Sequence, residues 1–208
     1  MKFKYRIPAD RWYFTSDLHL FHNNIVEICN RRCINLNSSI KLYDDITDQM
    51  LIDNWNSKVP EDGYVVIAGD FMLTSNQDKI RDILDKLNGT KILVLGNHCQ
   101  QNGFERKNVI DLFDSHVYDS LDLTVYDEEL DEKVRFYIQH YPCIHWTRGA
   151  YHLHGHIHSK NGSQDHGKVP FHPMRYDIGV DNNYYMPVSY QELKLIFAKQ
   201  ELKGMHNE

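Results

Sequence analysis

The sequence predicts a single α/β domain, and three observations support this fold class. Two continuous apolar runs, residues 64–68 and 91–95, have the pattern of strands that are buried on both faces. Amphipathic helical patterns over residues 44–58 and 75–87 alternate with these runs. Each apolar run ends at a polar cluster, and in open α/β sheets ligands bind beyond the carboxyl ends of the strands. We therefore expect a functional site at one edge of a sheet.

The composition is that of one soluble globular domain. The chain has 208 residues, of which 41% are hydrophobic and 25% are charged, and this length favours one domain over residues 1–208. The net charge of −6 argues against a surface that coats long nucleic acid, though not against a local basic pocket. Residues 1–10 have no apolar signal-peptide core, and no apolar run reaches the roughly 20 residues of a membrane span. The four cysteines form no CxxC pair, so we expect reduced thiols and a cytoplasmic location.

The remaining elements can be expected from local patterns. Residues 11–16 are a short β-rich run, and residues 23–32 have helical character. In the second half, residues 120–126 and 133–139 flank an acidic turn and predict a hairpin with a solvated tip. A further short strand is expected at residues 174–178.

The C-terminal segment, residues 187–200, is expected to close the chain as a helix. Ser189 and Glu192 have capping-box spacing at its start.

The segment from Tyr151 to His158 carries a histidine at every second position. Alternate side chains of a strand point to the same face. A strand over this segment would therefore hold a column of four imidazoles, the commonest neutral metal ligand. They are His152, His154, His156 and His158.

Side chains that bind metals follow five separate predicted segments. They are Asp17 and His19, then Asp70, then Asn97 with His98, then His140, and finally His156 with His158. Carboxylates, an amide oxygen and imidazoles form the mixed ligand set that suits Mn²⁺, Fe or Zn²⁺. They exceed the four ligands of one tetrahedral site, so we expect two metals. Paired metals recur in enzymes that transfer phosphoryl groups.

These blocks resemble, in type and order, the five motifs of the calcineurin-like metallophosphoesterases. The blocks are Asp17-x-His19, Gly69-Asp70, Gly96-Asn97-His98, His140 and Gly155-His156-x-His158. Residues 16–24, 140–142, 153–156 and 177–181 also resemble a compact bacterial and phage branch of small predicted phosphoesterases. The resemblance implies a sandwich of two mixed β-sheets flanked by helices, with a metal pair at the strand ends.

The resemblance also implies roles for individual residues. Asp17, His19 and His158 would hold one metal. Asn97, His140 and His156 would hold the other, and Asp70 would bridge the pair. A hydroxide between the metals would attack the phosphorus in line, without a covalent enzyme intermediate.

His98 would lie beside the scissile phosphate, together with Asn97, as a residue that binds no metal. It could protonate the leaving oxygen or stabilise charge on the phosphoryl group. In the family an acidic residue often follows Gly-Asn-His and is thought to orient this histidine. Here that position is Cys99, which weakens the proton-donor assignment but not the metal site.

Two interpretations stay open for several other polar residues. His22 could face substrate phosphate, or it could cap a helix or lie on the surface. Arg31 and Arg32 could grip phosphate, or they could form an exposed basic helix end that complements the dipole. Arg148, between two metal blocks, is a candidate substrate contact.

The other histidines and two aspartates are expected to have supporting roles. His152 and His154 are expected to be structural or to support the ligands, and His145, His166 and His172 are expected on loops. Asp177 and Asp181 flank Gly179, where turn formation explains both and one could orient a metal-bound histidine.

We expect a dinuclear metal-dependent phosphoesterase with Mn²⁺ as its metal, and Fe or Zn²⁺ as alternatives. A chain this short has little room for a cap domain, so an open cleft favours a nucleotide-type phosphodiester over a small enclosed phosphomonoester. Long nucleic acid is disfavoured by the negative charge. A phosphomonoesterase (phosphatase), a single-zinc hydrolase and a non-catalytic scaffold of this fold that binds a protein are the alternatives.

Overall fold

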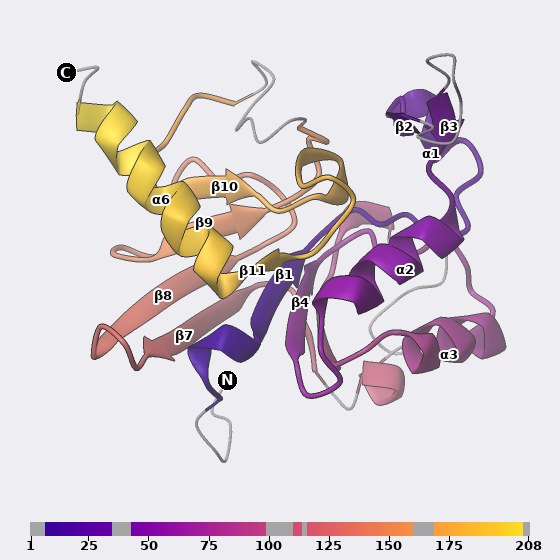
Figure 1. The fold of residues 1–208 in the computed structure, drawn as a ribbon, viewed down its shortest axis with the longest axis horizontal. Helices are drawn as coiled ribbons and strands as arrows, with labels where there is room; N and C mark the ends of the chain where they lie inside the picture. Colours follow the sequence, from indigo (N-terminus) through magenta and orange to yellow (C-terminus); the bar gives the residue numbers. More distant parts are fainter. Residues whose placement is uncertain (1–6, 35–42, 99–109, 114–115, 160–168, 206–208) are drawn as a thin grey trace.

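Two mixed β-sheets form the centre of the protein (Figure 1). The computed structural model describes residues 7–34, 43–98, 110–113, 116–159 and 169–205. The strand order is β11-β1-β4-β5-β6 in the first sheet and β10-β9-β8-β7 in the second. The α/β class and the two mixed sheets flanked by helices agree with the sequence prediction.

The first sheet contains four parallel strands and one antiparallel strand. They are β1 (Trp12–Thr15), β4 (Tyr64–Ala68), β5 (Thr90–Val94), β6 (Val117–Tyr118) and the antiparallel β11 (Val188–Ser189). The two apolar runs are β4 and β5, and they are buried on both faces. Val65, Ile67 and Leu93 pack under helices, whereas Val66 and Ile92 face the second sheet.

The second sheet contains the predicted hairpin. Its strands are β7 (Leu121–Asp127), β8 (Glu132–Ile138), β9 (Tyr151–His154) and β10 (Arg175–Asp177). Strands β7 and β8 are antiparallel, whereas β8, β9 and β10 run parallel. Leu121, Leu123 and Val125 alternate with exposed residues and contribute to the core between the sheets. The acidic tip at residues 128–132 is exposed, as expected.

Three capped helices flank the sheets. α2 (Asp48–Lys58) is capped by Thr47, whose side chain accepts the Met50 N–H, and α3 (Gln77–Lys86) is capped by Asn76. Both helices cover the outer face of the first sheet. α6 (Tyr190–Met205) starts with the predicted capping box, since Ser189 N–H and hydroxyl both donate to Glu192 at 2.8 Å.

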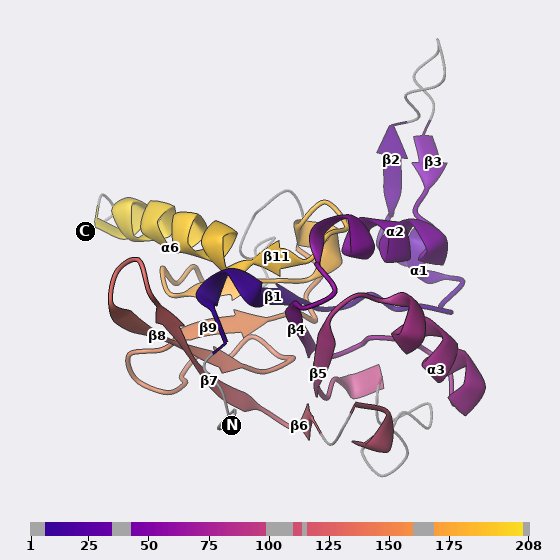
Figure 2. The same ribbon diagram turned by 60° about the horizontal axis from the view of Figure 1, so that its bottom comes forward.

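One predicted helix is much shorter than expected. The helical pattern over residues 23–32 produces only α1 (Ile25–Ile28), because Asn30 takes a left-handed backbone (φ 48°) that ends it. The chain then enters a hairpin of β2 (Arg32–Ile34) and β3 (Tyr43–Asp45), which the sequence reasoning missed. Figure 2 shows this hairpin projecting away from the sheets.

Short 3₁₀ segments complete the fold. They are η1 (Ala9–Arg11), η2 (Ile110–Phe113) and η3 (Val180–Asn182). None of the helices in the described part of the chain has the length and apolar character needed to cross a bilayer.

Candidate metal centre

The predicted ligands follow strands of both sheets and meet at one place. They follow β1, β4 and β5 of the first sheet and β8 and β9 of the second, and they are Asp17, His19, Asp70, Asn97, His140, His156 and His158. A bridge between Ser16 and Gly179 holds the end of β1 beside the segment after β10. The parallel strand ends of two sheets therefore converge, as the polar clusters predict.

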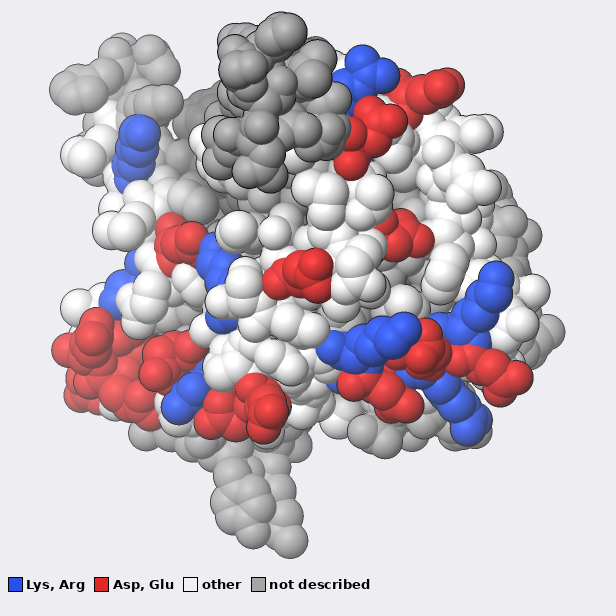
Figure 3. Space-filling view, turned by 45° about the vertical axis from the view of Figure 1, so that its right-hand side comes forward, with Lys and Arg blue, Asp and Glu red and all other residues white. Residues whose placement is uncertain are grey.

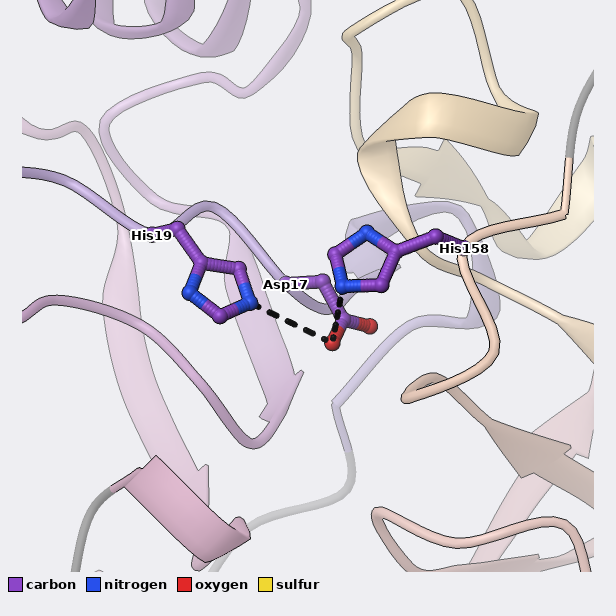
Figure 4. Close-up of side chains that lie close together, drawn as sticks. All are labelled: Asp17, His19 and His158. Atoms are coloured by element: carbon purple, nitrogen blue, oxygen red, sulfur yellow. Dashed lines mark ion pairs between the residues drawn. The ribbon is translucent and has the colours of Figure 1, made fainter. Parts of the chain in front are cut away.

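The first ligand group consists of Asp17, His19 and His158 (Figure 4). The Asp17 Oδ1 lies 3.8 Å from the His19 Nε2 and 3.9 Å from the His158 Nε2. Asp17 and His19 are buried, yet Asp17 Oδ1 and His19 Nε2 have no hydrogen-bond partner among the described residues. Buried polar atoms are normally paired, and a cation between these three ligand atoms would satisfy them.

The second ligand group consists of Asn97, His140 and His156. The His140 Nε2 lies 2.8 Å from the Asn97 Oδ1 and 3.2 Å from the His156 Nδ1. Asp70 joins the two groups, since its Oδ2 lies 3.3 Å from the His140 Nε2 and 3.7 Å from the His19 Nε2. Its position between the groups is the one that a bridging carboxylate needs.

The tautomer of His140 favours a metal at the second group. The His140 Nδ1–H donates to the Ala68 carbonyl at 2.9 Å, so its Nε2 lone pair faces the Asn97 and Asp70 oxygens. Acceptors that face one another are stable only with a proton or a metal among them. The donor set of carboxylate, amide oxygen and imidazole fits Mn²⁺, Fe or Zn²⁺. The residues present therefore fit a metal pair.

The pKa values reflect this crowding of acceptors. Burial lowers the pKa of His19 to about 4, so its ring is neutral and available as a ligand. Burial alone would also lower the pKa of His140, but the hydrogen bond and charge of Asp70 raise it. At His158 burial is likewise outweighed, here mainly by the hydrogen bond to Asp181, and the pKa rises to about 10. When no metal is bound, the neighbouring carboxylates therefore favour the charged form of both rings.

The backbone is strained at the predicted ligands. Left-handed φ values of 47° to 72° occur at Asp17, His19, Asp70, His156 and His158. Such values cost of order 1–3 kcal/mol at a non-glycine residue and cluster at functional sites. The left-handed conformations at these positions therefore lower the stability of the fold and direct the side chains towards one another.

Two glycines before predicted ligands allow close approach of the neighbouring segment. A Cβ on Gly96 would lie 3.0 Å from the Asp70 Cγ, with the Asp70 Oδ1 closer still. A Cβ on Gly155 would lie 2.7 Å from the Ser16 Cβ and would collide with the Asp17 Oδ2. The Gly-Asn-His and Gly-His-x-His spacings are thus explained by packing of the ligand segments.

His98 and His22 lie beside the centre. The His98 backbone N–H donates to the Asp70 Oδ1 at 3.0 Å, and its half-buried ring lies 5.2 Å from that of His19. The His22 Nδ1 lies 3.4 Å from the His19 Nδ1, and its ring is 6.1 Å from that of His98. His22 therefore lies beside the predicted ligands, and its contact with substrate phosphate stays a prediction. Cys99 lies outside the described residues.

The predicted column of imidazoles is wrong in part. β9 ends at His154, and the left-handed residues His156 and His158 lie in the loop beyond it. His152 and His154 are completely buried. The Cys143 N–H donates to the His152 Nε2 at 2.9 Å, and the His152 Nδ1–H donates to the Tyr137 carbonyl at 3.1 Å. His152 thus has the structural role that was expected.

The interpretation of Arg31 and Arg32 as an exposed basic helix end is wrong for Arg31. Only Arg32 is exposed, and it pairs with Asp45 at 3.0 Å. Arg31 is 1% exposed and pairs with Asp181 at 2.8 Å. A buried arginine cannot be recognised from the helical pattern, because the early end of α1 turns it inward.

Asp181 and Asp177 differ in what they contact. The Asp181 Oδ2 lies 2.7 Å from the His158 Nδ1, so Asp181 orients a predicted ligand. Asp177 accepts the Ser159 and Gly179 backbone N–H groups and holds the turn. The Cys29 thiol, which sequence reasoning missed, belongs to a group with His158 and Asp181 whose polar atoms lie within 4.8 Å of one another.

Arg148 lines a different hollow from the one that Asn97 lines. It is exposed and lines a hollow of about 260 Å³ with Trp146 and His172, whose rings are 4.6 Å apart. None of the contacts among the described residues joins Arg148 to either ligand group. His145 is exposed on the same loop, and His166 lies outside the described residues.

Comparison with known proteins does not name a family for this chain. No protein-family model matches it. An uncharacterized protein of Methanocaldococcus jannaschii is 37% identical over 87 residues, which are 41% of this chain and 45% of that protein. The Gene 66 protein of Mycobacterium phage L5 is 36% identical over 90 residues, 41% of this chain and 38% of that protein. Each match therefore spans less than half the length of the relative.

A similar fold occurs in a solved structure. The crystal structure of a protein of unknown function from Aquifex aeolicus has a TM-score of 0.60 with 20% identity, and it covers 89% of this chain and 98% of that one. At this identity the likeness concerns the fold alone.

Proposed function

We propose that the protein is a dinuclear metal-dependent phosphoesterase. The observation that carries the proposal is the pair of ligand groups that share Asp70, whose Oδ2 lies within 3.7 Å of imidazole nitrogens from both groups. The five sequence blocks that resemble the motifs of calcineurin-like metallophosphoesterases contain the same residues. Divalent ions held there, Mn²⁺ first, would polarise phosphoryl oxygens and lower the pKa of the attacking water.

The chain supplies the other parts of such a reaction. Asn97 and His98 follow β5 and flank the Asp70 carboxylate, where a phosphate ester would lie. His98 would hold a proton for the leaving oxygen, and general acid catalysis of this kind contributes about 10²–10⁴-fold. His22, beside His19 and His98, would contribute a second imidazole to phosphate binding.

The surroundings favour a nucleotide-type phosphodiester as substrate. His156 is exposed, so the centre is open on one side. A hollow of about 220 Å³ lined by Asn97, Gln139 and Tyr141 adjoins the second ligand group and offers room for the organic part of an ester. Among the described residues on the face in Figure 3, basic and acidic side chains are interspersed without a broad basic surface, which disfavours long nucleic acid.

Turnover of two model substrates tests the proposal. The purified chain would be loaded with Mn²⁺ and assayed on an aryl phosphodiester and the matching monoester, beside an Asp70→Asn variant. We expect hydrolysis that depends on both Mn²⁺ and Asp70 and is faster for the diester. Faster monoester hydrolysis would reassign the substrate. A folded chain without turnover on either ester would refute the enzyme and favour a protein-binding scaffold.

A further inference from the structure

Arg31 is a fully buried cation placed between the segments that carry the first ligand group. Asn30 ends α1 in the left-handed conformation, and the Arg31 N–H then donates to the Val26 carbonyl at 2.9 Å, five residues back. This helix-ending turn reverses the chain. It directs the Arg31 side chain inward and leaves it 1% exposed.

Two donors of Arg31 hold the segment after β1. Its Nη1 donates to the Leu18 carbonyl at 2.7 Å, and its Nη2 donates to the Asp17 carbonyl at 2.6 Å. Asp17 and His19 on this segment have left-handed backbones, with φ of 56° and 53°. A strained segment persists only when its surroundings fix it, and the guanidinium supplies that constraint.

The other donors of Arg31 hold Asp181 against the third ligand. The Nε and Nη2 donate to the two Asp181 oxygens at 3.0 and 2.8 Å, which is the bidentate geometry specific to arginine. The same Asp181 Oδ2 lies 2.7 Å from the His158 Nδ1. The His158 Nε2 is thereby turned towards the Asp17 Oδ1, 3.9 Å away.

We propose that Arg31 is the positioning residue of the first ligand group and that it sets the affinity of that metal selectively. One guanidinium fixes the backbone of Asp17 and Leu18 and, through Asp181, the ring of His158. None of its hydrogen bonds among the described residues reaches Asn97, His140 or His156. The inference rests on the proposed function, because it requires that the two groups bind metal.

The test compares two neighbouring arginines. Arg31→Lys keeps a positive charge beside Asp181 but loses the forked geometry, and Arg32→Lys makes the same change at an exposed residue paired with Asp45. Each metal-free chain would be titrated with Mn²⁺ by calorimetry. Electron paramagnetic resonance would distinguish a spin-coupled Mn²⁺ pair from an isolated ion, and near-ultraviolet circular dichroism would check the fold.

We expect Arg31→Lys to bind one Mn²⁺ as the wild type does and the second about 10- to 100-fold more weakly, the usual effect of residues that orient ligands. When Mn²⁺ exceeds the two binding sites by one equivalent, the wild-type spectrum should be that of a coupled pair. The Arg31→Lys spectrum should then be that of an isolated ion. Arg32→Lys should match the wild type. If Arg31→Lys does not fold, Asp181→Asn should show the same selective loss of affinity for the metal of the first ligand group, which contains His158.

Other outcomes separate this inference from the proposed function. Two Mn²⁺ bound to Arg31→Lys with wild-type affinities would overturn the positioning role and leave the phosphoesterase proposal intact. Equally weaker binding of both ions would show a general loosening of the fold and would also overturn the positioning role. A wild-type chain that binds no Mn²⁺ would overturn the proposed function and this inference together.

Discussion

Replacement of Gly155 by alanine is expected to displace Asp17 and weaken the first ligand group. The added Cβ would lie 2.7 Å from the Ser16 Cβ, whereas ordinary contacts begin at 3.4 Å. The two segments must therefore separate by at least 0.7 Å, the difference between these distances, and the collision with the Asp17 Oδ2 requires more. The His156 N–H, which donates to this oxygen at 2.9 Å, would move with it.

The expected magnitudes follow from this displacement. Overpacking of a tight site typically costs about 1–3 kcal/mol. At about 2–4 °C per kcal/mol for a chain of this size, the midpoint of thermal unfolding should fall by about 2–12 °C. A misplacement near 1 Å can cost about 100-fold in turnover. Thermal unfolding of the metal-free chain and a Mn²⁺ titration would measure the two effects separately.

Gly149→Ala is the matched control. Gly149 has a φ of 75° and nothing within 4 Å of an added Cβ, so alanine there introduces backbone strain without a collision. It should lower stability but leave Mn²⁺ affinity unchanged. Wild-type Mn²⁺ affinity in Gly155→Ala would refute the reasoning that this glycine makes room for a metal ligand.

Four further results are expected. Asp70→Asn keeps the Oδ1 that accepts the His98 N–H but changes the shared Oδ2. The metal content should therefore fall below two ions, and turnover should fall by at least about 100-fold, which exceeds the usual effect of a residue that orients ligands. His98→Gln should keep both ions and lose about 10²–10⁴-fold in turnover; lost metal would instead make His98 a ligand. Chelation of two Mn²⁺ ions, each present at 100 times its dissociation constant, should remove about 2.7 kcal/mol per ion, or about 5.4 kcal/mol in total. The unfolding midpoint should fall by about 11–22 °C, and an unchanged midpoint would argue against bound metal. Burial lowers the pKa of His152 to about 3, below the 6.5 of the unfolded chain, so the stability it contributes is present above pH 6.5 and is lost as the pH falls towards 3. Urea unfolding of the metal-free His152→Gln variant should depend on pH less steeply than wild type by about 1.4 kcal/mol per pH unit, and equal slopes would contradict this.

The strands and the grouping of the ligands follow from local sequence patterns. The apolar runs of β4 and β5 have no polar face that could contact water. This pattern is expected only of a strand that is covered on both faces. Because such strands are parallel, their carboxyl ends meet, and Asp70 and Asn97 could be placed together before the structure was known. The roles of these residues as metal ligands stay predictions.

Other features depend on contacts between distant segments and could not be predicted. The pattern around Arg31 is that of an exposed helix end, and only the left-handed turn at Asn30 buries it against Asp181, 150 residues away. The alternation of histidines suggests one strand face. His156 and His158 instead have positive φ beyond the end of β9, where Gly155 packs on the Ser16 segment. Periodicity describes local conformation and contains no information about such packing.

Anomalous diffraction from crystals of the chain grown with Mn²⁺ would test the central claim most directly. We expect two peaks about 3.5–4 Å apart, the spacing of paired-metal sites. One should contact Asp17, His19 and His158, and the other should contact Asn97, His140 and His156, with Asp70 touching both. One peak would contradict the dinuclear centre, and no peak in these ligand groups would contradict the metal site altogether.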